Sequence, residues 1–268
     1  MSVEYQFGSR PAAASPVTLQ PKCDREACWI ESVEHGWLFL LPGSKGTGWL
    51  LSVGDSVESL LATSRLIKEQ LSNVDPPRGI FPSHPRVSLP LSAPGWVACG
   101  TAAMGFDPLC GDGTGNAVRE AILASAMIRA ICTGGDPPSL IAYYQARLLA
   151  GFQKHIALCL DFYESGSAGP WWHRQLDDLK HGLEWCSEQL PVEAASRYRL
   201  NGFQLEPAEL KLQLCRESHR TLQGCRCSSG LFLPHRKLLN VFREYPLTAV
   251  KLSIFARGIA RAKGVAIS

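Results

Sequence analysis

Short runs of hydrophobic residues in the N-terminal third of the chain predict β-strands. They cover Trp29–Val33, Gly36–Pro42 and Trp49–Val53, and turn residues at 43–48 separate the last two runs. The second and third runs are apolar almost without interruption, which predicts strands that are covered on both faces. A shorter strand is predicted over Pro16–Gln20. Together these strands are expected to form an antiparallel sheet.

Apolar residues at helical spacing predict helices along much of the rest of the chain. Asp55 and Ser56 are suited to cap a helix that runs through Leu71 and ends before Pro76. A stretch rich in proline then leads to a predicted strand over Trp96–Cys99. Five further helices are predicted over residues 116–131, 139–163, 171–189, 206–219 and 238–258.

The predicted helix over residues 116–131 has an apolar period. Val118, Ile122, Ala126 and Met127 recur at helical spacing, and small residues lie between them. This spacing is the reason that a helix is predicted here.

The segment GTAAMGFDPLCGDGTGNA, Gly100–Ala117, joins the predicted strand to this helix and contains five glycines. A helix N-terminus offers unpaired N–H groups and a partial positive charge, and glycines let a ligand approach the backbone. Such a loop can hold a phosphate or another electron-rich group. Its spacing matches neither GxxxxGK[ST] nor GxGxxG, so a connection without a ligand is an equally weighted alternative.

The order of residues in this segment resembles a known cofactor motif. Gly100-Thr101-Ala102-Ala103, followed by Phe106–Gly113, is similar to the second FAD-binding motif of flavin-dependent monooxygenases of the aromatic-hydroxylase class. Flavin-dependent halogenases and geranylgeranyl reductases share that motif, which reads Gly-Asp-Ala-Ala, a spacer, and Asp-Pro-x-x-Gly-x-Gly at the start of a helix. The resemblance is specific over residues 95–131 and loose elsewhere, although Arg199–Phe203 also resembles the C-terminal region of these enzymes.

The resemblance implies a fold and a cofactor. The expected fold is α/β (α+β), a partial FAD-binding Rossmann-like fold with an antiparallel substrate-side sheet and a helical C-terminal region. The expected division is a sheet segment with one helix over residues 1–92, the FAD motif over 93–135, and a mostly helical region over 136–268. The expected cofactor is FAD.

The family also implies roles for individual residues in this loop. Asp107 and Pro108 are expected beside the flavin ring, and the backbone N–H groups of residues 111–114 are expected to face its pyrimidine edge. Thr101 stands where the family has Asp and can still bond a ribityl hydroxyl group. The implied cofactor-binding set is Gly100, Thr101, Asp107, Pro108, Gly111, Asp112, Gly113, Thr114 and Gly115. No catalytic residue is assigned.

The first FAD motif of these families, a strand followed by GxGxxG and a helix, has no counterpart in the sequence. The chain therefore resembles the C-terminal portion of a longer flavoprotein. A truncated reading frame, a split gene, and a subunit completed by a separate N-terminal FAD-binding chain are the explanations left open. Since a parallel sheet without its central strand exposes apolar surface, the isolated chain is expected to be poorly stable or to bind FAD weakly.

The function that this resemblance implies is that of an FAD-dependent oxidoreductase of the monooxygenase type, acting on a small organic molecule. A halogenase would use the same loop, but the lysine and the Trp-x-Trp-x-x-Ile segment of halogenases are not recognisable in the sequence. A flavin reductase acting on isoprenoid double bonds is also compatible. The alternative from another class is a non-catalytic remnant or interaction subunit that no longer binds FAD by itself.

Charge and composition narrow the possible partners and location. The net charge of +3, with scattered basic residues, argues against a nucleic-acid or membrane-surface partner. The sequence shows neither a signal peptide nor an apolar run of the roughly 18 residues that a membrane span needs. The ten cysteines are interpreted as reduced thiols of a cytoplasmic protein.

Two further groups of residues have competing interpretations. The first group has the Cys and His residues that a zinc site needs, but their spacing is irregular. Cysteines without a metal-binding role are therefore the favoured interpretation, and no metal is predicted. This group consists of Cys215, His219, Cys225, Cys227 and His235. Trp171 and Trp172 could line an aromatic pocket, but an anchor in the core is favoured. Four other histidines have no visible partner pattern, namely His84, His155, His173 and His181.

Overall fold

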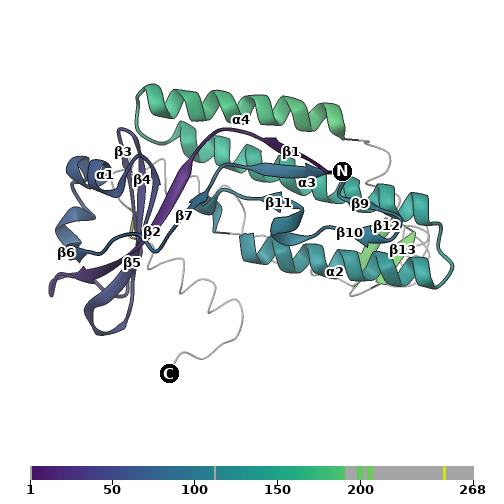
Figure 1. Ribbon diagram of the computed structural model, residues 1–268, viewed down its shortest axis with the longest axis horizontal. Helices are drawn as coiled ribbons and strands as arrows, with labels where there is room; N and C mark the ends of the chain where they lie inside the picture. The colour runs from purple at the N-terminus through teal and green to yellow at the C-terminus, as the bar shows by residue number, and fades with distance from the viewer. Residues whose placement is uncertain (1, 112, 191–197, 202–203, 208–249, 252–268) are drawn as a thin grey trace, which may run out of the picture. The chain divides into compact units, whose positions relative to one another are not determined.

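The computed structural model describes residues 2–111, 113–190, 198–201, 204–207 and 250–251 (Figure 1). The chain divides into two compact units. The sheet unit takes its described residues from segments 9–83, 161–177 and 250–251. The loop unit takes its described residues from segments 2–8, 84–160 and 178–207. The division into segments 1–92, 93–135 and 136–268 stays a prediction.

The sheet unit is built on an antiparallel sheet with the strand order β14-β3-β4-β5-β2-β6, and β7 also pairs with β2. The strands are β2 Pro11–Leu19, β3 Trp29–Val33, β4 Gly36–Pro42, β5 Thr47–Gly54, β6 Leu71–Val74, β7 Gly79–Pro82 and β14 Val250–Lys251. The predicted bounds of β3 and β4 are confirmed. β2 begins five residues earlier than the predicted Pro16, because Pro11–Ala14 pair with β7.

The prediction that β4 and β5 are covered on both faces holds for only part of their length. Trp37, Leu38 and Leu40 of β4 are buried. Leu41 and Trp49, which lie opposite each other in the register, are each 45% exposed. The apolar run therefore continues beyond the covered part of the sheet.

The helix predicted from Ser56 through Leu71 ends early. Helix α1 spans Val57–Thr63, and the Ser56 hydroxyl group caps it by accepting from the Ser59 N–H group, as predicted. A short 3₁₀ turn, Lys68–Gln70, and strand β6 follow. The cause is Glu31 of β3, which takes up the N–H groups that a longer helix would use for its own bonds.

Glu31 is a buried carboxylate, only 4% exposed. Its oxygens accept hydrogen bonds from the backbone N–H groups of residues 65, 66 and 67, at distances between 2.7 and 3.3 Å. The Ser64 hydroxyl group also donates to it, at 2.6 Å. Charge-assisted bonds of this kind are stronger than neutral ones, so the chain turns here instead of continuing as a helix.

The tryptophan pair belongs to the core of the sheet unit, as favoured above. Trp172 Nε1 donates to the Val33 carbonyl oxygen at 2.8 Å, and the rings of Trp171 and Trp172 meet edge to face with centroids 5.0 Å apart. Trp37 Nε1 donates to the Tyr163 hydroxyl oxygen at 3.2 Å. The buried indole groups of Trp37 and Trp172 thus have hydrogen-bond partners, which is the usual condition for placing an indole group in a core.

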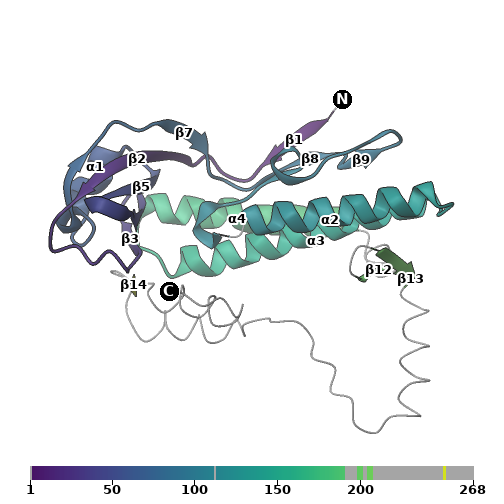
Figure 2. The ribbon, with the colours of Figure 1, turned by 90° about the horizontal axis from the view of Figure 1, so that it is seen from below.

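Three long helices dominate the C-terminal half of the described chain. They are α2 Gly113–Cys132, α3 Pro137–Glu164 and α4 Pro170–Gln189. The predicted helices over residues 116–131, 139–163 and 171–189 are therefore confirmed. Figure 2 shows α2 beside α3. No helix among the described residues is long and apolar enough to span a membrane.

The loop unit also contains small antiparallel sheets. β8 pairs with β1 and β11, β9 pairs with β10, and β12 pairs with β13. These strands are β1 Val3–Gln6, β8 Arg86–Leu89, β9 Ser92–Ala93, β10 Trp96–Val97, β11 Met104–Gly105, β12 Tyr198–Asn201 and β13 Gln204–Pro207. The predicted strand Trp96–Cys99 is shortened to β10, since the Ala98 N–H group turns to the Leu91 carbonyl oxygen.

The last two predicted helices are wrong where the structure describes them. Glu206 and Pro207 belong to β13, which pairs with β12. Val250 and Lys251 form β14 and pair with Ile30 and Trp29 of β3, so their backbone serves a sheet edge and not a helical turn. The rest of both segments, with the five Cys and His residues of the zinc alternative, lies outside the described residues.

Candidate functional site

The segment Gly100–Ala117 folds into a series of tight turns before α2 begins. Two 3₁₀ turns, Gly100–Ala102 and Pro108–Cys110, flank the two-residue strand β11. Gly100 and Gly111 both have φ of 60°, a left-handed conformation that strains residues with a Cβ atom. The path of the backbone therefore favours glycine at these two positions.

Asp107 is one of the residues that shape this loop. It is 1% exposed, and its carboxylate accepts from the Leu109 N–H group at 2.9 Å, which caps the second 3₁₀ turn. The Asp107 N–H group donates to His155 Nε2 of α3 at 2.8 Å. Because Nε2 accepts a hydrogen bond, the His155 ring is in the tautomer that carries its proton on Nδ1.

The sequence assigns no role to His155, because no pattern of partner residues surrounds it. In the structure it is buried, and Phe106 meets its ring edge to face with centroids 4.7 Å apart. Besides the Asp107 N–H group, Cys159 Sγ lies 3.4 Å from His155 Nε2. The contact with the loop is to a backbone N–H group, which no spacing of side chains could have revealed. His155 thus holds the Phe106–Asp107 part of the loop against α3.

The other side of the loop is open. A Cβ atom added to Gly111 or Gly113 would meet nothing within 4 Å. Both glycines are exposed, as are the side chains of Thr101 and Thr114. The loop therefore presents bare backbone at Gly111 and Gly113, next to the first turn of α2, and a flat ligand could approach the backbone there.

The remaining residues of the predicted set are less accessible. Gly100, Pro108 and Gly115 are half-buried, and the Cβ atom of Ala117 lies 3.5 Å from the place where a Cβ of Gly100 would be. Asp112 lies outside the described residues. Within the predicted cofactor-binding set, Gly111 and Gly113 are therefore accessible to a ligand, whereas Asp107 is buried.

The electrostatics of this place come from α2. Its 20 residues align their peptide dipoles, and its first turn contains no acidic side chain that would oppose the positive end. The N–H groups at the start of a helix have no partners within the helix. An electron-rich edge of a ligand is therefore favoured at Gly113.

Two buried side chains that sequence reasoning missed fix the loop to the helices. Glu120 of α2 accepts from the Gly100 N–H group at 2.7 Å, and the Tyr144 hydroxyl group of α3 donates to the Ala98 carbonyl oxygen at 2.6 Å. Burial raises the pKa of both side chains. An acid among the apolar residues of the buried helix face, three and four residues before Leu123 and Ala124, was the available sequence signal for Glu120.

Replacement of Glu120 by Gln is expected to preserve the loop and change its pH dependence. Gln keeps an oxygen that can accept from Gly100. Burial disfavours the charged carboxylate, so the folded-state pKa of Glu120 lies above its usual 4.5 and protonation stabilises the native protein. The stability of the wild type relative to Glu120→Gln should therefore rise as the pH falls through the raised pKa toward 4.5, and be lowest above it.

Urea unfolding of both proteins at a series of pH values measures this difference. Glu120→Ala, which removes the acceptor altogether, should lose about 1 kcal/mol at neutral pH. If the stability of the wild type relative to Glu120→Gln instead increased as the pH rises, the result would contradict the burial of the carboxylate.

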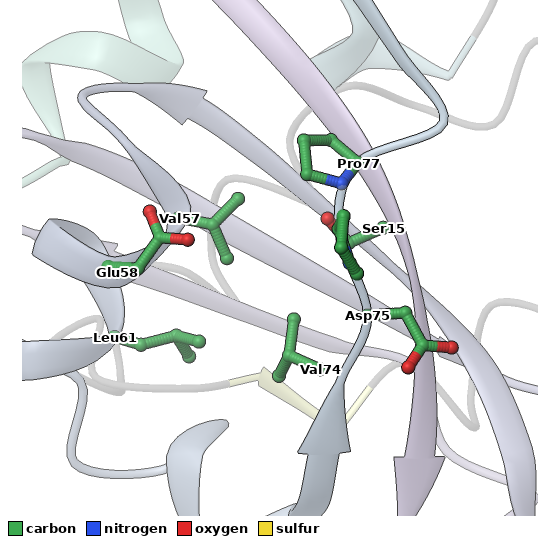
Figure 3. Close-up of a pocket in the computed structure, with 8 residues that line it drawn as sticks. Ser15, Val57, Glu58, Leu61, Val74, Asp75 and Pro77 are labelled. Atoms are coloured by element: carbon green, nitrogen blue, oxygen red, sulfur yellow. The ribbon is translucent and has the colours of Figure 1, made fainter.

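The structure also contains a separate cleft, in the sheet unit, of about 250 Å³ (Figure 3). Val57, Glu58 and Leu61 of α1 form one wall, and Val74 and Pro77 belong to the opposite wall. None of the residues that line it belongs to Gly100–Ala117. Within the described residues, no group of His, Cys, Asp or Glu is arranged to hold a metal ion. The glycine loop therefore stays the candidate site.

Comparison with known proteins supports the fold and leaves the site untested. No family model and no curated protein sequence matches the chain. Among solved structures, the flavin-dependent halogenase CmlS is 19% identical with a TM-score of 0.58, over 82% of this chain and 46% of that chain. The halogenase BrvH from Brevundimonas sp. BAL3 is 16% identical with a TM-score of 0.55, over 98% of this chain and 50% of that chain.

A third solved structure has another activity. The peptidyl tryptophan dihydroxylase QhpG is 15% identical with a TM-score of 0.55, over 91% of this chain and 64% of that chain. The fold of this chain is thus the mixed α/β fold, with an antiparallel sheet and C-terminal helices, that these enzymes contain. The chain spans about half the length of the two halogenases, 46% and 50%.

Proposed function

We propose that this chain is part of an FAD-dependent oxidoreductase of the monooxygenase type and that Gly100–Ala117 holds the flavin ring. The observation that carries the proposal is the exposed, side-chain-free backbone at Gly111 and Gly113, placed at the positive end of α2. The likeness in fold to flavin-dependent enzymes supports it. The substrate class is a small organic molecule.

The residues present fit the ring half of the cofactor. A planar ring can lie against Gly111 and Gly113 because neither carries a Cβ atom and nothing fills the space. The exposed Thr101 hydroxyl group is suited to a ribityl hydroxyl group, and the start of α2 favours negative charge on the ring. When bound, the flavin supplies the redox chemistry, while this chain binds and orients it.

The sequence shows no motif for the other half of the cofactor. The sequence contains no GxGxxG, the motif that binds the ADP half of FAD in dinucleotide folds. We therefore propose that a separate N-terminal FAD-binding module supplies that half. The same lack supports the second candidate function, a non-catalytic interaction subunit that retains the glycine loop as inherited structure.

The two candidate functions differ in whether the protein binds FAD, which absorbs visible light. The protein is purified and titrated with FAD, alone and with the N-terminal module added, while absorbance is followed in the flavin bands. FAD bound in either case favours the oxidoreductase. A folded protein that stays colourless with saturating FAD and with the module present would refute the proposal and favour the non-catalytic subunit.

A further inference from the structure

Helix α2 has a row of exposed, uncharged residues along one face. The residues of this face recur at helical spacing, and they lie on the opposite side of the helix from the buried residues Leu123 and Met127. We name this face the α2 stripe, and it consists of Thr114, Val118, Ala121, Ser125, Ile128 and Cys132. Val118 is 55% exposed and Ile128 is 47% exposed.

The α2 stripe departs from what a solvated helix face normally contains. Such faces carry charged and polar side chains, whereas the six stripe residues are all uncharged. Of the charged residues of α2, Arg119 lies off the stripe, Glu120 is buried, and the exposed Arg129 borders the stripe near its C-terminal end. Strand β13 contacts α2, and the six stripe residues stay exposed all the same. The core of a protein interface is depleted of charged residues, and the uncharged α2 stripe with its exposed Val118 and Ile128 suits such a core.

The position of the α2 stripe indicates what packs there. Its first residue, Thr114, belongs to the proposed flavin site, so an occupant of the stripe borders the cofactor. The two halogenases of similar fold are about twice as long as the part this chain matches, with 46% and 50% covered. The unmatched remainder is a polypeptide of similar size to this chain.

We propose that the α2 stripe docks the polypeptide module that binds the ADP half of FAD. The inference rests on the proposed function, because it takes the ring half of the cofactor to lie at Gly111 and Gly113. It goes further in assigning the surface on which the module sits. A neutral apolar stripe suits the core of such an interface and does not suit a nucleic acid or an acidic peptide, which basic side chains would recognise.

The probe is the polypeptide encoded by the DNA directly upstream of this reading frame, which is expected to contain GxGxxG. Where it is a separate frame, the two chains are mixed and the complex is measured by light scattering and calorimetry. Ala121→Glu places a charge in the middle of the stripe and should weaken the complex roughly 100-fold or more, because an interface core excludes unpaired charge. Ser125→Glu should act in the same way.

Ala157→Glu is the matched control. Ala157 is an exposed alanine within α3, so the substitution introduces the same charge on a helix outside the stripe and should leave the affinity unchanged. Where the upstream stretch is in frame, the full-length chain is used. There Ala121→Glu should lower the melting temperature and the FAD retained on purification, and Ala157→Glu should do neither.

Several results would overturn the inference. They are an equal affinity for Ala121→Glu and the control, a homodimer of this chain that Ala121→Glu dissociates, and an upstream stretch without a dinucleotide-binding motif. The flavin proposal fails separately. A colourless complex that Ala121→Glu dissociates would refute the flavin site and support the docking surface. A yellow complex that is insensitive to Ala121→Glu would support the flavin site and refute the docking surface.

Discussion

Gly113→Val is expected to weaken FAD binding roughly 100-fold or more, about 2.7 kcal/mol, and to leave the fold intact. The added side chain enters open space in the protein, since a Cβ atom at Gly113 meets nothing within 4 Å. It would occupy the volume that the flavin ring needs if the ring lies against this backbone. The dissociation constant is measured by quenching of flavin fluorescence, and the fold is checked by circular dichroism.

The chain offers a matched control for this substitution. Gly151 is an exposed glycine within α3 that also has nothing within 4 Å of an added Cβ atom. Gly151→Val should leave FAD affinity unchanged, because valine is tolerated in a helix at least as well as glycine. If Gly113→Val bound FAD as tightly as Gly151→Val does, the flavin would not lie where we propose.

Glu31→Ala should have the largest effect on stability, a loss of about 3–5 kcal/mol in the free energy of unfolding. The substitution removes the acceptor for three backbone N–H groups and for the Ser64 hydroxyl group. These donors lie within or beside the core of the sheet unit, where Ile67 is fully buried. Donors left without a partner in such a place pay the full penalty of desolvation.

Glu31→Gln should recover only part of this loss, since its amide group presents N–H donors to other donors at one of the two oxygen positions. Glu34→Ala is the control, because Glu34 is an exposed carboxylate only three residues along the chain. Its free energy of unfolding should stay within about 0.5 kcal/mol of the wild type. Urea unfolding measures all three variants. Equal stability of Glu31→Ala and Glu34→Ala would show that the chain turn after α1 does not depend on the buried carboxylate.

The sequence was most informative where structure depends on local pattern. The bounds of β3 and β4 and the three long helices follow from apolar period, prolines and caps, which act within a few residues. The early end of α1 could not be predicted in this way. It depends on Glu31, which is 34 residues before Arg65 in the chain and meets it only in the folded sheet unit.

The candidate site shows the same division. The glycines of the loop and the start of α2 are visible in the sequence, and two of those glycines do have a left-handed backbone. The inward carboxylate of Asp107 and its tie to His155 arise from contacts across 48 residues. Val118 fits the apolar period of α2 and is nevertheless exposed, because a period identifies apolar residues and does not say which surface covers them.

Hydrogen–deuterium exchange with and without FAD tests the central claim most directly. The protein is used with its N-terminal module so that both halves of the cofactor have a site. We predict that FAD slows exchange at the amides of residues 100–117, and most strongly around Gly111 and Gly113, where the bare backbone is exposed. Unchanged exchange in that segment, with protection by FAD elsewhere in this chain or nowhere in it, would contradict the account.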